Sequence, residues 1–230
     1  GRQRFIAMDI GPIGKLLQPL GDLPFEQAVQ LFGDMAALGE QNGADAILIE
    51  TISDTYEAKA AVLGAGRLLR DLNGMPEGMI EILPVFVTVT FDGTSRLMTG
   101  ASPQAAVALL EGLGAEVVGL NCGLGPLQML EPAQEMLRWA SRPVMVKPNA
   151  GLPRLQVTCY DISPARFAEA MRPIVRSGAR IVGGCCGTTP EHIRALAEVL
   201  AQETPKPLTV KEDTLISSYT HAVALGERPL

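Results

Sequence analysis

Short apolar segments alternate with longer amphipathic segments along most of the chain. The short segments are almost continuously apolar, which is typical of parallel strands that are covered on both faces. In the longer segments the apolar residues recur every three or four positions, as they do on one face of a helix. The pattern predicts six strands, at Arg4–Ile10, Ala46–Glu50, Pro84–Thr90, Glu116–Asn121, Pro143–Lys147 and Arg180–Gly183.

Each predicted strand is followed by a predicted helix. Strict alternation of this kind implies right-handed crossovers and a parallel sheet, either open or closed into a barrel. Six units do not close an eight-stranded barrel, so we expect either an open sheet or two further units upstream of Gly1. The helices are expected at Phe25–Gly39, Asp54–Arg70, Pro103–Leu113, Leu127–Ala140, Pro164–Ser177 and Pro190–Gln202.

The alternating pattern stops after residue 203. We therefore expect one domain over residues 1–203, and we interpret residues 204–230 as a linker or a docked tail.

The net charge of −6 and the pI near 5.0, with scattered basic residues, give no electrostatic footprint for nucleic acid. No apolar run approaches the roughly 20 residues of a membrane span. The first residues lack the features of a signal peptide, so a cytoplasmic protein is expected.

Three of the four cysteines follow predicted strands. Cys122 comes directly after one buried strand, and the adjacent Cys185 and Cys186 follow another within a glycine-rich segment. Because the carboxyl ends of parallel strands meet at one edge of a sheet, these thiols are expected to converge there. Three thiolates form a zinc site with one open position, which a thiol substrate could occupy.

Cysteines in such a sequence can have other roles. Buried cysteines often pack as small hydrophobic residues, and this is our interpretation of Cys159. Adjacent residues of a strand face opposite ways, so Cys185 and Cys186 can share an ion only where the backbone leaves strand geometry, as the flanking glycines allow. A vicinal disulfide between them would be strained. We interpret His192, at a helix start, and His221 as capping or surface residues.

Polar residues at other strand ends are candidates for substrate contacts. Glu50 ends an apolar strand, and its carboxylate could bind a ligand amine, serve as an anion at a helix N-terminus or form a salt bridge. Asn149 follows the fifth strand and could hydrogen-bond a substrate or its own turn. Asp92 is expected to form a turn.

The segment from Gly183 to Ile193, together with Gly119–Cys122, Ile49–Thr51 and Pro148–Gly151, resembles the zinc-dependent homocysteine S-methyltransferase domain. The resemblance extends from about residue 4 to residue 202. It implies a (β/α)8 barrel of TIM type with the site at its carboxyl-terminal face, and methyl transfer to homocysteine to give methionine. By the same resemblance, Cys122, Cys185 and Cys186 would be the zinc ligands. Glu50 would take the amino group of homocysteine, and Asn149 would lie near the substrate.

The segment Ile216–Leu230 resembles the connector that follows this domain in cobalamin-dependent methionine synthases, before a folate-binding domain. This implies methylcobalamin as the methyl donor, carried on a separate domain or partner, and folate- and cobalamin-binding modules as partners. The first two βα units of the family have no counterpart here, so an incomplete barrel is expected. Two alternatives stay open: betaine or S-methylmethionine as the donor, or a non-catalytic zinc-binding barrel fragment that a partner completes.

Overall fold

The computed structural model describes residues 3–73, 83–152 and 160–225, so Cys159 lies outside the described residues. Six parallel strands form one sheet, and their order in the sheet is their order in the sequence. All six predicted strands are confirmed, the last of them shortened to two residues. The strands are β1 (Ala7–Ile10), β2 (Ala46–Ile52), β3 (Val85–Val89), β4 (Val117–Asn121), β5 (Val144–Lys147) and β6 (Ile181–Val182).

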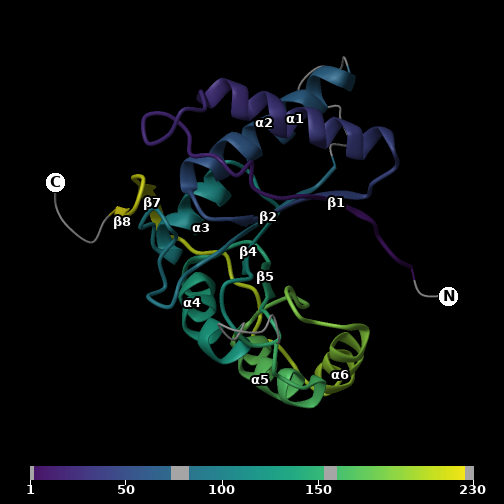
Figure 1. Ribbon diagram of the computed structural model, residues 1–230. Helices are drawn as coiled ribbons and strands as arrows, with labels where there is room; N and C mark the ends of the chain where they lie inside the picture. Colours follow the sequence, from purple (N-terminus) through teal and green to yellow (C-terminus); the bar gives the residue numbers. More distant parts are fainter. Residues whose placement is uncertain (1–2, 74–82, 153–159, 226–230) are drawn as a thin grey trace.

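A helix follows each strand, and Figure 1 shows these helices along the outside of the sheet. Helices α1 and α2 lie beside β1 and β2, whereas α4, α5 and α6 lie at the other end. All six predicted helices are confirmed with end shifts of at most three residues. They are α1 (Phe25–Gln41), α2 (Thr55–Asn73), α3 (Pro103–Gly112), α4 (Pro126–Trp139), α5 (Pro164–Ser177) and α6 (Pro190–Leu200).

The apolar runs of the strands form the core. Val118 pairs with Val87 on one side and with Val144 on the other, and all three side chains are fully buried. Within the described part of the chain, β1 and β6 each have a single neighbour, so the sheet is open between them. Because all pairs are parallel, the carboxyl ends of all six strands lie at one edge.

The sequence pattern did not predict the structure of the tail. Residues Thr214–Ser217 (β7) and Ala222–Leu225 (β8) form an antiparallel hairpin. The tail packs on the main domain: the amide of Ser102 donates to the carbonyl oxygen of Thr220 at 3.1 Å, and the amide of Lys211 donates to Ser141 Oγ at 2.8 Å. The hairpin contacts α3, as Figure 1 shows at the left.

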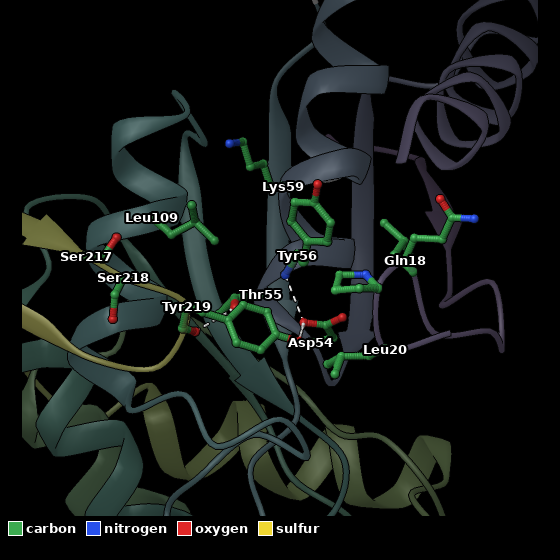
Figure 2. A pocket seen from close by; sticks show the side chains of 12 residues that line it. Gln18, Leu20, Asp54, Thr55, Tyr56, Lys59, Leu109, Ser217, Ser218 and Tyr219 are labelled. Carbon is green, nitrogen blue, oxygen red and sulfur yellow. Dashed lines mark hydrogen bonds between the residues drawn. The ribbon is translucent and has the colours of Figure 1, made fainter. Parts of the chain in front are cut away.

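The turn of the hairpin is anchored at the start of α2 (Figure 2). The Tyr219 hydroxyl donates to Asp54 Oδ1 at 2.7 Å, and the Thr55 hydroxyl donates to the carbonyl oxygen of Tyr219 at 2.9 Å. The Asp54 side chain is buried and also accepts a bond from the amide of Tyr56. A mainly apolar hollow of about 510 Å³ lies between this anchor, the loop before α1 and Leu109 of α3.

We expect Tyr219→Phe to lower the free energy of unfolding by about 1 kcal/mol at neutral pH, because the buried Asp54 carboxylate loses a donor. Burial, together with the bond to Asp54, raises the pKa of Tyr219 to about 12. The tyrosine pKa in the unfolded chain is near 10, so the folded protein holds the phenol proton more tightly than the unfolded chain does. This stabilises the fold fully below about pH 10, and the contribution is lost as the pH rises through about 12. Urea unfolding of both proteins from about pH 8 to about pH 12 measures this. A difference that stayed constant over this range would contradict the role of the phenol.

Candidate metal centre

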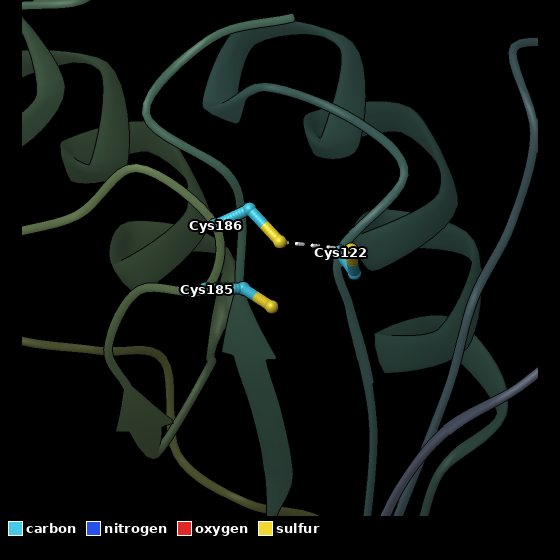
Figure 3. A group of neighbouring side chains, drawn as sticks. All are labelled: Cys122, Cys185 and Cys186. Carbon is cyan, nitrogen blue, oxygen red and sulfur yellow. Dashed lines mark hydrogen bonds between the residues drawn. The ribbon is translucent and has the colours of Figure 1, made fainter. Parts of the chain in front are cut away.

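Three cysteine sulfurs lie together at the carboxyl-terminal edge of the sheet (Figure 3). The Sγ atoms of Cys122 and Cys186 are 3.7 Å apart, and the sulfurs of Cys122, Cys185 and Cys186 all lie within 4.8 Å of one another. Cys122 and Cys185 are half-buried, Cys186 is exposed, and all three are free thiols. The structure thus brings together the three thiols that the sequence singled out, at the edge where they were expected.

The end of β4 places Cys122. Its backbone leaves the strand with a φ of 58°, in the left-handed region that few residues other than glycine adopt. Its amide donates to the carbonyl oxygen of Lys147 at 3.1 Å, and its own carbonyl accepts from Leu124 at 2.7 Å. These two bonds hold a backbone conformation that a free chain would avoid, and they turn the thiol away from the strand direction.

The loop after β6 places the adjacent pair. The strand ends at Val182, so Cys185 and Cys186 lie outside strand geometry, as a shared site requires. The amide of Cys185 donates to the carbonyl of Pro148 at 2.9 Å, and the carbonyl of Cys186 accepts from Ala150 at 2.9 Å. Gly187 then takes a φ of 77°, and an added Cβ would lie 2.2 Å from the Tyr160 ring. The glycine predicted to permit this turn is therefore required by both conformation and space.

The three thiols influence one another's ionisation. The Cys185 thiol donates to Cys122, and this bond is the main reason that the pKa of Cys122 falls to about 5. The same bond and burial raise the pKa of Cys185. A lowered pKa favours the thiolate form of Cys122, which is the form that binds metals.

The geometry of the sulfurs fits zinc. Sulfurs bound at about 2.3 Å to one tetrahedral zinc are about 3.8 Å apart, close to the 3.7 Å between Cys122 and Cys186. That separation is too long for a disulfide, whose sulfurs are about 2.05 Å apart. The vicinal disulfide between Cys185 and Cys186 is also not formed. Within the described ranges, Cys122, Cys185 and Cys186 are the one group of three or more cysteine, histidine or acidic side chains arranged for a metal ion.

Glu50 lies on β2, where its carboxylate pairs with the ammonium group of Lys147 on β5. Both side chains are mostly buried: 19% of the Glu50 side chain and 16% of the Lys147 side chain is exposed. Burial and the nearby Glu50 raise the pKa of Asp9, whereas Lys147 lowers it. The predicted salt bridge of Glu50 is therefore present. A contact of Glu50 with a substrate amine stays a prediction.

Asn149 is buried and braces the cysteine loop. Its Oδ1 accepts a hydrogen bond from the backbone amide of Cys186 at 3.0 Å, and its backbone amide donates to the carbonyl oxygen of Leu124. The sequence predicts a contact of Asn149 with the substrate or with its own turn, and this bond to the adjacent cysteine loop was not predicted.

Two further residues contact the cysteines, and sequence reasoning missed them both. Asn121 donates from Nδ2 to Cys185 Sγ at 3.7 Å. The Tyr160 hydroxyl is hydrogen-bonded to Cys186, which raises the pKa of the tyrosine. The available signal for Asn121 was its position: an amide that ends an otherwise apolar strand, directly before Cys122.

The capping and turn predictions are confirmed. His192 is buried and forms a capping box with Thr189, and its Nε2 atom lies 2.8 Å from the carbonyl oxygen of Ile162. His221 lies in the tail hairpin turn, where its Nδ1 is 2.7 Å from Thr220 Oγ1. Asp92 closes a turn by accepting from the amides of Thr94 and Arg96. No helix within the described ranges has the length and apolar character needed to cross a bilayer.

The chain is similar to known proteins over most of its length. The sequence model of the family described as homocysteine S-methyltransferase matches residues 1–200. The chain is 37% identical over 203 residues to the methionine synthase of Mycobacterium leprae (strain TN), covering 87% of this chain and 16% of that protein. It is 38% identical over 224 residues to the methionine synthase of Mycobacterium tuberculosis (strain ATCC 25618 / H37Rv), covering 95% and 18%. The chain therefore spans less than a fifth of the length of these relatives.

Solved structures agree on the fold. The crystal structure of the homocysteine methyltransferase MmuM from Escherichia coli in its apo form superimposes with a TM-score of 0.62 at 25% identity, covering 85% of this chain and 62% of that one. Its metallated form gives a TM-score of 0.61 at 24% identity, covering 84% and 60%. The predicted (β/α)8 barrel class is confirmed, and the six strands described here form part of such a barrel.

Proposed function

Because this chain belongs to the homocysteine S-methyltransferase family, we propose that Cys122, Cys185 and Cys186 bind zinc and that the chain activates homocysteine as a methyl acceptor. The observation that carries the proposal is the convergence of the three sulfurs within 4.8 Å of one another. Zinc held by three thiolates supplies an open fourth position, where a substrate thiol binds as its thiolate at neutral pH.

The protein's own residues have separate tasks in this proposal. Glu50 binds the ammonium group of homocysteine. Before the substrate binds, Lys147 holds the Glu50 carboxylate in place. Asn149 positions the Cys186 backbone and lies close to the substrate. The substrate sulfur forms the new carbon–sulfur bond with its lone pair while the bond from the methyl carbon to the donor breaks, and the electrons of that bond leave with the donor. The main requirement of this in-line transfer is alignment, since no proton moves in the step.

The proposed methyl donor is methylcobalamin, carried on a separate domain or partner. The similarity to methionine synthases over most of the chain supports this choice. The match of the family model to residues 1–200 supports a homocysteine-binding barrel at residues 1–203, and we propose that residues 204–230 are a tail that leads toward a following domain. The folate- and cobalamin-binding modules are proposed partners because the relatives are methionine synthases. Betaine and S-methylmethionine are the alternative donors.

The first experiment measures zinc per chain in protein purified under reducing conditions. We expect close to one zinc per chain. Calorimetric titration with homocysteine should then show binding to the zinc-loaded protein and much weaker binding after the zinc is removed. Folded protein without zinc would contradict the proposal and favour a non-catalytic barrel fragment. Single-turnover assays with methylcobalamin, betaine and S-methylmethionine then separate the donors.

A further inference from the structure

Asn121 is a fully buried amide whose side chain joins three strands and the cysteine loop. Its Oδ1 accepts from the backbone amide of Thr51 at 2.9 Å and from the Thr88 hydroxyl at 2.8 Å. Its Nδ2 donates to Thr51 Oγ1 at 2.8 Å and to Cys185 Sγ at 3.7 Å. Both donors and both acceptor sites of the amide are therefore used, so its orientation is fixed.

The partner on β2 is conformationally strained. Thr51 has a φ of 65°, which is costly for a β-branched residue, and the pairing register of β2 shifts between Ile49 and Ile52. Asn121 holds this residue from across β3 through two hydrogen bonds, one accepted from the Thr51 amide and one donated to the Thr51 hydroxyl. Glu50 directly precedes Thr51, so the same bonds fix the place where the Glu50 carboxylate leaves the strand.

We propose that Asn121 is a positioning residue, whose single side chain holds the Cys185 sulfur and the Glu50–Thr51 turn in one fixed relation. The proposal rests on the function proposed above and deepens it, because it links the thiol site to the carboxylate that binds the substrate amine. The amino group of an amino thiol would then bind at the Glu50 carboxylate and its sulfur at the cysteine site. The buried side chain of Asn121 would set the distance between these two places.

The chemistry of an amide accounts for this role. Asparagine presents a donor to the sulfur and an acceptor to the Thr51 amide at the same time. In Asn121→Asp the acceptor remains, but the donor is replaced by a charged oxygen beside Cys185. In Asn121→Leu both functions are lost. Thr88→Val removes one bond to the Asn121 oxygen without touching the donor side, and it is the matched control.

The first test titrates each reduced, metal-free protein with Co²⁺ in competition with a chelator. Loss of a residue that orients a ligand typically weakens metal affinity by about 10- to 100-fold, and we expect this of Asn121→Asp. Its thiolate-to-cobalt absorption should also decrease, because Cys185 is no longer held in place. Thr88→Val should weaken binding much less than Asn121→Asp does, because the bond from Asn121 to Cys185 and both bonds to Thr51 remain. Equal Co²⁺ affinity in the wild type, Asn121→Asp and Thr88→Val would overturn the proposal.

The second test needs no metal. Hydrogen exchange of the Thr51 amide should become at least about tenfold faster in Asn121→Leu, because its acceptor is removed, and should be little changed in Asn121→Asp, which keeps an acceptor. Unchanged exchange in Asn121→Leu would also overturn the proposal. If the wild type bound no metal, the proposed function would fail, and the exchange result alone would decide the role of Asn121. Thr51→Ser keeps the hydroxyl and should match the wild type in both tests, whereas Thr51→Ala should weaken metal binding.

Discussion

Cys185→Ser should reduce the zinc affinity of the protein by more than about 100-fold, so that the variant is isolated with little zinc. Removal of a residue that only supports a metal ligand costs about 10- to 100-fold, and removal of a ligand costs more. A serine hydroxyl is not ionised at neutral pH and is a harder donor than a thiolate. Homocysteine binding should be lost with the zinc. Metal analysis after dialysis against a chelator, followed by calorimetry with homocysteine, measures both.

The control for this variant is Cys159→Ser, which removes the cysteine that we predict to be structural. It should keep its zinc. The metal-free forms of Cys185→Ser and the wild type should unfold at similar denaturant concentrations, because Cys185 is only half-buried and its environment is already polar. Unchanged zinc content and homocysteine binding in Cys185→Ser would contradict the three-thiolate site.

The strands and helices were predictable because the fold is built from repeated local patterns. The fully buried run from Val117 to Asn121 is typical of a central parallel strand. Ser102 caps α3 by accepting a hydrogen bond from the amide of Ala105, and a proline follows at the first helical position. Convergence of the cysteines was also predictable, since it follows from parallel topology and strand ends alone.

Features that depend on contacts between distant segments were not predictable. Asn121 joins residues 51, 88 and 185, and no local pattern around it indicates those partners. The pairing of Glu50 with Lys147 depends on the curvature of the sheet, which brings β2 near β5. The tail hairpin is short, and it is held by burial of Ala224 and by the hydrogen bonds of Tyr219 with Asp54 and Thr55, which the sequence of the hairpin does not indicate.

The second large effect is expected for Gly119→Ala in β4. A Cβ at this position would lie 2.1 Å from the carbonyl oxygen of Met145, its partner on β5. Because the obstructing atom belongs to the backbone of a paired strand, a rotamer change cannot relieve the overlap. We expect the free energy of unfolding to fall by about 3 kcal/mol. Gly112→Ala is the control: nothing lies within 4 Å of its added Cβ at the end of α3, and its stability should stay equal or rise by up to about 1 kcal/mol.

Gly119→Ala also tests how the sheet supports the metal centre. Asn121 and Cys122 follow Gly119 by two and three residues, so separating β4 from β5 displaces the amide and the thiol together. We therefore expect Gly119→Ala to lose stability in the metal-free state and also zinc affinity, whereas Cys185→Ser should lose zinc affinity alone. Urea unfolding of the metal-free proteins beside Co²⁺ titration separates the two patterns. A Gly119→Ala protein as stable as the wild type would mean that β4 and β5 are farther apart at this point than the structure places them.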